Sequence, residues 1–178
     1  MKLPIVFGGL SVGFIDLADR RVYSNKTFSF TCLQTAKCCM QMAIPVTDFD
    51  VDRIETYGYE VDQIIEVLSP VLRIPKTIRG NVEKNYWIKK KPYIGGCRFL
   101  EEDRCSIHEV KPFGCRVFPF SFYYRSDTLV EVLVHESNIC DGIEEEDDGN
   151  SVLEELMEVL LEEMEIRDRY FDTHKNKI

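Results

Sequence analysis

Apolar residues along this chain follow both alternating and helical spacings, in segments that are mostly short. Residues 1–31 are extended in character, with a Gly-Gly pair and an Asp-Arg-Arg triplet as turns. A helix is expected from Thr47-Asp48, because a hydroxyl or carboxylate there can accept hydrogen bonds from the free N–H groups of the first turn. A second helix is predicted over Glu60 to Leu68, where apolar residues recur at helical spacing before Pro70.

Two β-hairpins are predicted in the second half of the chain. One turns at 101–104 and would bring Cys97 and Cys105 across from each other. The other joins 118–124 to 129–135, and valines alternate along its second arm.

We expect Ser151 to cap a long helix that runs to about Phe171, with Glu154 at the capping-box position. Its apolar stripe consists of Leu153, Leu156, Met157, Leu160, Leu161 and Met164. These patterns predict an α+β fold: a small single domain with short helices and β-hairpins around a cysteine-rich metal site, plus this amphipathic helix. We expect a cysteine-cluster domain over 1–149 and an acidic helix over 150–178 that packs on the same domain. A dimerising or partner-binding helix is the alternative.

The net charge of −9 is concentrated near the C-terminus, where residues 141–172 hold 14 acidic residues and two arginines. The remainder is close to neutral and lacks the basic footprint of a nucleic-acid-binding protein. No apolar run reaches the length of a membrane span, and no export signal is recognisable at the N-terminus. We therefore expect a cytoplasmic protein that binds neither nucleic acid nor membrane.

Seven cysteines dominate the candidate chemistry. Thiolates are soft ligands that suit zinc, iron and iron–sulfur clusters. Clustered thiols in a reducing cytosol are more often metal ligands than disulfides, and an odd number cannot all pair within one chain. The sequence therefore predicts a zinc or iron site, mononuclear or an iron–sulfur cluster. The candidate ligands are Cys32, Cys38, Cys39, Cys97, Cys105, Cys115, Cys140 and His108.

The cysteines stand within a longer ordered set of motifs. These motifs are Phe30-Thr-Cys32, Cys38-Cys39, Val46-Thr47, Asp52-Arg53-Ile54, Cys97-Arg-Phe99-Leu100, Cys105-Ser-Ile107-His108, Lys111-Pro112, Cys115-Arg116-Val-Phe118-Pro119-Phe120 and Cys140-Asp-Gly142. The set resembles the YkgJ-like cysteine-cluster family, a CxxCxxCC type of zinc- or iron-chelating domain. The resemblance spans about residues 30–142 and implies metal chelation. Thr35 stands where that family has its second cysteine.

Three functions are compatible with these residues. The first is a metal-binding module without catalysis of its own. The second is a metal-dependent enzyme for redox or protein methyl-transfer chemistry, since similar cysteine segments are found in flagellin lysine methylases. The third is a thiol–disulfide protein. We rank the binding module first, because the sequence offers no clear catalytic base, nucleophile or cofactor fingerprint. The metal ion is the only partner that the sequence implies.

Overall fold

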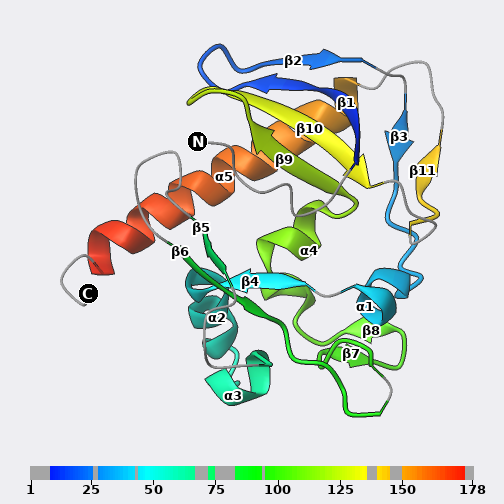
Figure 1. The fold of residues 1–178 in the computed structure, drawn as a ribbon, viewed down its shortest axis with the longest axis vertical. Helices are drawn as coiled ribbons and strands as arrows, with labels where there is room; N and C mark the ends of the chain where they lie inside the picture. Colours follow the sequence, from blue (N-terminus) through cyan, green and yellow to red (C-terminus); the bar gives the residue numbers. More distant parts are fainter. Residues whose placement is uncertain are drawn as a thin grey trace. The chain divides into compact units, whose positions relative to one another are not determined.

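The chain forms two compact units, which we describe separately. The computed structural model describes residues 9–25, 28–42, 44–66, 72–74, 83–93, 95–135, 140–144 and 150–174 (Figure 1). Unit 1 comprises Met1–Leu33 and Val117–Ile178, and unit 2 comprises Gln34–Arg116. Helices and small antiparallel sheets occur together, so the prediction of an α+β fold is confirmed.

Unit 1 is built on an antiparallel sheet with the strand order β2-β1-β10-β9. Its strands are β1 (Gly9–Asp16), β2 (Arg21–Ser24), β9 (Phe120–Tyr124) and β10 (Leu129–His135). The predicted hairpin of β9 and β10 is confirmed. At the centre of the sheet, Ile15 pairs with Val130, and both side chains are fully buried. Alternation along β1 and β10 therefore gives the sheet one strongly apolar face.

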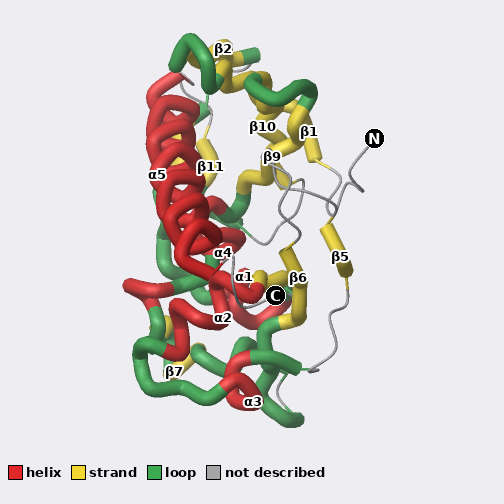
Figure 2. Tube along the Cα trace, turned by 90° about the vertical axis from the view of Figure 1, so that its left-hand side faces the viewer, coloured by secondary structure: helices red, strands yellow, loops and turns green. Residues whose placement is uncertain are grey.

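Helix α5 (Asn150–His174) packs along the sheet of unit 1 (Figures 1 and 2). Four members of the predicted stripe are buried, and Leu161 and Met164 are half-exposed. Gly13 of β1 permits the close approach, because a Cβ there would lie 2.5 Å from Leu153 Cδ1. The helix begins at Asn150, so Ser151 lies inside its first turn and the prediction of Ser151 as its cap is wrong.

A two-stranded ribbon of β3 (Ser29–Phe30) and β11 (Ile143–Glu144) also belongs to unit 1. It continues beyond Phe30, because the Thr31 N–H donates to the Gly142 carbonyl oxygen at 2.8 Å. The Phe30 ring packs edge-on against Phe120 of β9, with the ring centroids 5.4 Å apart. This aromatic contact fixes the ribbon against the edge strand of the main sheet.

Unit 2 contains a three-stranded antiparallel sheet with the order β4-β6-β5. The strands of this sheet are β4 (Pro45–Thr47), β5 (Leu72–Ile74) and β6 (Glu83–Trp87). The helices α2 (Asp48–Glu55) and α3 (Val61–Ile64) follow β4 in the chain. The predicted helix start at Thr47-Asp48 is confirmed, with Thr47 as the N-cap of α2. Helix α3 is shorter than predicted, and residues 67–70 lie outside the described residues. The fully buried apolar side chains of this unit include Val46, Ile54, Ile64, Phe99 and Ile107.

Short elements carry most of the cysteines of unit 2. They are α1 (Lys37–Gln41), β7 (Leu100–Glu101), β8 (Arg104–Cys105), the 3-10 helix His108–Val110 and α4 (Phe113–Val117). The predicted hairpin at 101–104 is confirmed, but Cys105 pairs with Leu100. The expectation that Cys97 and Cys105 lie directly opposite each other in this hairpin is therefore wrong, since the short turn sets a different register.

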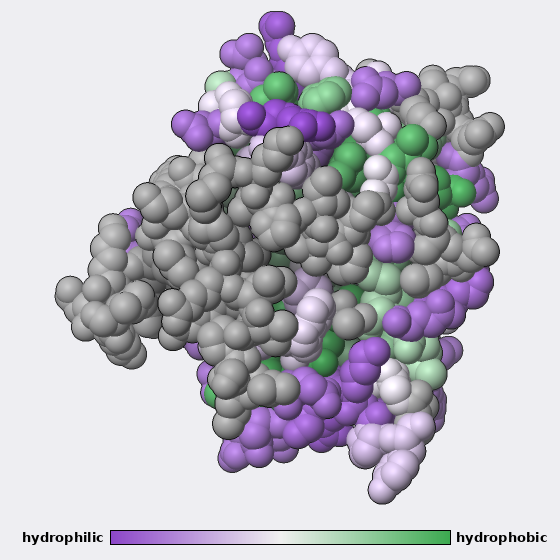
Figure 3. Space-filling model, viewed as in Figure 1, coloured by the Kyte–Doolittle hydropathy of each residue, from purple (hydrophilic) through white to green (hydrophobic). Residues whose placement is uncertain are grey.

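The described surface is mixed in character. On the face drawn in Figure 3, hydrophilic areas and smaller hydrophobic areas lie next to one another among the described residues. Among the described residues, no helix combines the length and the apolar character that crossing a membrane requires.

Candidate metal centre

Five of the seven cysteines lie in unit 2. Cys38 and Cys39 come from α1, Cys97 from the loop before β7, Cys105 from β8 and Cys115 from α4. Cys97 is buried and the other four are half-buried, and all are free thiols. The Cys97 N–H donates to the Cys39 carbonyl oxygen at 2.7 Å. This backbone hydrogen bond joins two cysteine segments that lie almost sixty residues apart in the sequence.

The five thiols influence one another electrostatically, which places them in one neighbourhood within unit 2. Burial raises the pKa of Cys115, and the charges of Cys97, Cys105 and Cys38 raise it further. The charge of Cys97 also raises the pKa of Cys39. Such interactions weaken with distance, so the sequence segments that supply these five thiols converge.

The neighbouring thiols of Cys38 and Cys39 shift each other's pKa in opposite directions. The Cys39 thiol donates a hydrogen bond to Cys38, and this is the main reason why the pKa of Cys38 falls to about 6. The same hydrogen bond, followed by burial, raises the pKa of Cys39. Cys38 is therefore the preferred thiolate of the pair, and Cys39 its donor.

Two lysines lie beside the thiols. Burial is the main factor that raises the pKa values of Cys97 and Cys105, whereas Lys91 acts in the opposite direction on Cys97 and Lys111 on Cys105. The Lys91 ammonium donates to the Leu100 carbonyl oxygen, which holds it near the β7–β8 hairpin. The ammonium charges offset only part of the cost of ionising buried thiols, so a cation bound among them would favour the thiolate forms strongly.

The five thiols of unit 2 are of the type that binds a soft metal ion, although their side chains do not form a complete coordination shell. Across the described ranges, no three Cys, His, Asp or Glu side chains stand in a metal-holding arrangement. The chemistry of five gathered thiols nevertheless matches the ligands of zinc and of iron–sulfur centres. Bound metal would supply charge compensation and cross-linking of the short elements.

Cys32 and Cys140 belong to unit 1. Phe30 pairs with Ile143 in the β3–β11 ribbon, and Thr31 hydrogen-bonds to Gly142. This register places both cysteines at the same end of the ribbon. Cys32 is exposed and Cys140 half-buried.

The remaining predicted ligand, His108, is exposed on the 3-10 helix. Its Nε2 lies 3.3 Å from Lys111 Nζ. Lys111 in turn lowers the pKa values of Cys38 and Cys105 through its charge, behind the larger effects of other groups. Arg116 follows Cys115 on α4 and is half-buried.

Sequence reasoning missed Asp50. This carboxylate is only 2% exposed, and its charge raises the pKa of Cys115, behind the larger effects of burial, Cys97 and Cys105. The motif comparison selected Asp52 instead, which is half-buried. Asp50 stands three residues after Thr47, and this capping-box spacing is the signal that could have identified it.

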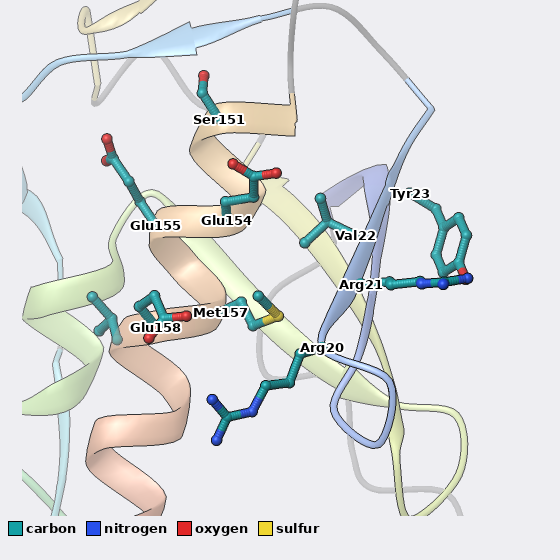
Figure 4. Close-up of a pocket in the computed structure, with 10 residues that line it drawn as sticks. Arg20, Arg21, Val22, Tyr23, Ser151, Glu154, Glu155, Met157 and Glu158 are labelled. Atoms are coloured by element: carbon teal, nitrogen blue, oxygen red, sulfur yellow. The ribbon is translucent and has the colours of Figure 1, made fainter.

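Unit 1 also has a groove between β2 and the first turns of α5 (Figure 4). Its volume is about 900 Å³, and its walls include Arg20, Val22, Glu154 and Met157. Arg20 extends towards α5, whereas Arg21 points away from it (Figure 4). The groove is lined by no cysteine among the described residues and is therefore not part of the thiol cluster.

Residues 31–141 match the CxxCxxCC family, which is described as a "Putative zinc- or iron-chelating domain". The match covers more than half of the chain, so the chain belongs to this family of metal-chelating domains. An uncharacterized protein of Methanocaldococcus jannaschii is 24% identical over 154 residues, which cover 83% of this chain and 46% of that protein. The chain thus spans about half the length of this curated relative. No solved structure matches the chain.

Proposed function

We propose that the protein is a metal-binding module that holds zinc or iron through the thiols of unit 2. The observation that carries the proposal is the convergence of five free thiols from four short segments. Membership of a zinc- or iron-chelating family supports it. A centre of this kind would tie the short elements together, as structural metal sites do in small domains.

The electrostatics of the thiols support a bound cation. Burial raises the pKa values of Cys97, Cys105 and Cys115, so each resists ionisation while no cation is present. Metal binding requires deprotonated sulfur, and the positive charge of the ion offsets the penalty of burying thiolates. The module should therefore release protons when it takes up metal.

The number of thiols supports either a mononuclear ion or a cluster. Tetrahedral zinc needs four ligands, and a four-iron cluster usually takes four thiolates. Unit 2 offers five thiols, of which Cys38 and Cys39 are sequence neighbours whose pKa values shift in opposite directions. Cys32, Cys140 and His108 remain candidates for a wider ligand set. Thr35 supplies no thiolate at the position where the resemblance expects one.

We assign no catalytic activity. A metal-dependent enzyme would be expected to have an open coordination position in a polar cleft. The described groove of unit 1 is lined by Arg20 and Glu154 and by no described cysteine, so it does not favour that alternative. The free state of all seven cysteines is consistent with a reducing compartment, and we propose the cytoplasm.

Metal analysis of anaerobically purified protein tests this function. Near-stoichiometric zinc or iron is expected, and the visible spectrum distinguishes an iron–sulfur cluster from zinc. Cys97→Ser and Cys115→Ser should lose most of the metal. Val130→Ala is the control, because it weakens the core of unit 1 without removing a thiol. Folded wild-type protein with reduced thiols and no metal would contradict the proposal.

A further inference from the structure

Asp50 makes more contacts than a helix cap requires. Its Oδ2 accepts hydrogen bonds from the Thr47 N–H at 3.0 Å and from the Thr47 hydroxyl at 2.9 Å. The first of these bonds, together with the Asp50 N–H that donates to the Thr47 hydroxyl oxygen at 3.2 Å, forms the capping box of α2. Its Oδ1 accepts from Arg53 Nη2 at 2.8 Å and from the Phe113 N–H at 3.1 Å. The second oxygen therefore reaches a segment 63 residues further along the chain.

Arg53 contacts the same segment. Its Nη2 donates to the Lys111 carbonyl oxygen at 3.0 Å as well as to Asp50. Asp50 and Arg53 thus bind the backbone on both sides of Pro112, whose own ring is fully buried. The guanidinium also lies over the Phe49 ring, 5.2 Å from its centroid. These contacts fix the Lys111–Phe113 backbone against α2.

The segment that they hold is the start of the helix that carries Cys115. Helix α4 begins at Phe113, and the N–H groups of Cys115 and Arg116 donate to the Pro112 carbonyl oxygen at 2.8 and 3.1 Å. The Asp50 charge also acts on the Cys115 thiol. A shift of the Lys111–Phe113 backbone would therefore move the thiol of Cys115 directly.

We propose that Asp50, braced by Arg53, is the positioning residue that sets Cys115 for metal binding. This inference rests on the proposed function of unit 2. A buried carboxylate is costly unless its oxygens are paired, and an uncharged amide could accept from the Thr47 N–H at this capping-box position without that cost. The charged group is explained by its second task, which is to hold Arg53 and the Phe113 N–H together.

Two variants of the full chain test this role. Asp50→Asn removes the charge and turns one acceptor into a donor that faces other donors. Arg53→Lys keeps a positive charge near Asp50 but loses the planar guanidinium group. It should therefore weaken the hydrogen bond to the Lys111 carbonyl oxygen, with a smaller effect than that of Asp50→Asn. Glu163→Gln is the matched control, because Glu163 is also 2% exposed and pairs with Arg167 at 3.0 Å on α5, which carries no cysteine.

Two measurements separate positioning from general stability. Cobalt(II) titration reports affinity and the sulfur-to-cobalt charge-transfer band. Alkylation of the metal-free protein, followed by peptide mass spectrometry, reports the reactivity of Cys115. Asp50→Asn should bind cobalt about 10–100-fold more weakly, the range found when groups that orient ligands are lost. Its Cys115 should react about tenfold faster, because the start of α4 opens more often. Glu163→Gln should match the wild type in both.

Three results would overturn the inference. The first is an Asp50→Asn protein with wild-type cobalt affinity and wild-type Cys115 reactivity. The second is a Glu163→Gln protein in which both quantities change as much as in Asp50→Asn. The third applies if circular dichroism shows that Asp50→Asn is unfolded, and it is an Arg53→Lys protein with wild-type cobalt affinity and Cys115 reactivity. Wild-type protein that takes up no metal ion would instead contradict the proposed function. The alkylation rates would still decide whether Asp50 positions Cys115.

Discussion

Unit 1 and the cysteine-bearing part of unit 2 use different means to hold their chains in place. Unit 1 has an eight-residue strand and a 25-residue helix, packed through fully buried residues such as Ile15, Val130 and Leu153. In unit 2, α1 and α4 have five residues each, and β7 and β8 have two each. Elements this short are not stable alone. The five cysteines of unit 2 therefore lie among short elements, in contrast to the long packed elements of unit 1.

The difference indicates where metal should matter. Long elements can bury apolar area at about 25 cal/mol per Å², which supplies most of the stability of an ordinary domain. The short elements of unit 2 rely more on specific links, such as the Cys97–Cys39 backbone hydrogen bond and the contacts of Asp50. A bound ion would add the strongest of these links. Metal-dependent stability should therefore be confined to unit 2.

Metal removal should have the largest effect and tests the comparison directly. Chelation under reducing conditions should lower the opening free energy of α1, the β7–β8 hairpin and α4 by about 5 kcal/mol or more, because structural zinc binding contributes about 10–16 kcal/mol in small domains. Strands β1 and β10 should keep their protection. Hydrogen exchange by mass spectrometry measures both. An equal loss of protection in both units would contradict the difference that we infer.

Leu153→Ala should break unit 1 without removing metal. The side chain is fully buried, and truncation of such a leucine costs about 3–5 kcal/mol. Chemical unfolding followed by far-UV circular dichroism measures the change in the free energy of unfolding, and the metal content is determined in parallel. Glu155→Ala, on the exposed side of the same helix, is the control and should change stability by less than about 0.5 kcal/mol. Metal loss in folded Leu153→Ala protein would show that the two units are not independent in this respect.

Two glycine substitutions compare backbone packing in the two units. In unit 1, Gly142→Ala should cost about 1–3 kcal/mol, because its Cβ would overlap the Thr31 carbonyl group in the β3–β11 ribbon. In unit 2, a Cβ at Gly114 would find the Pro45 oxygen at 3.8 Å, which is ordinary contact. Gly114→Ala should therefore be neutral or stabilising by up to about 1 kcal/mol. Urea unfolding measures the stability of both variants. If Gly114→Ala were less stable than Gly142→Ala, the packing that we describe around the two glycines would be contradicted.

Thr47→Ala should destabilise the protein by about 1 kcal/mol, because it removes the N-cap of α2. Thr56→Ala is a suitable control, since the Thr56 hydroxyl only donates to a carbonyl oxygen in an exposed turn among the contacts described. Thermal unfolding of the metal-loaded protein measures the difference. If Thr47→Ala lowered the free energy of unfolding as much as Leu153→Ala does, the expected small contribution of this cap would be wrong.

The features that sequence predicted correctly are those encoded locally. Alternating valines identified the β9–β10 hairpin, and a continuous apolar stripe identified α5. The β3–β11 ribbon joins segments more than a hundred residues apart, and no local pattern encodes that pairing. Register was equally hard to foresee, since the hairpin at 101–104 was recognised while the residue opposite Cys105 was not.

The candidate site was predictable in composition and less so in arrangement. The density of cysteines predicted the candidate donors, and the order of motifs identified the family. The partition of five thiols into unit 2, with Cys32 and Cys140 on a ribbon of unit 1, depends on long-range folding. The same holds for Asp50, whose contact with Phe113 spans 63 residues and leaves no trace in local spacing.

X-ray absorption spectroscopy at the zinc and iron edges tests the central claim most directly, with anaerobically purified wild-type protein and Cys115→Ser compared. The account predicts a first shell dominated by sulfur, at ~2.3 Å if the metal is zinc, and a loss of sulfur neighbours or of metal in Cys115→Ser. A first shell of oxygen and nitrogen alone, or an identical sulfur shell in Cys115→Ser, would contradict it.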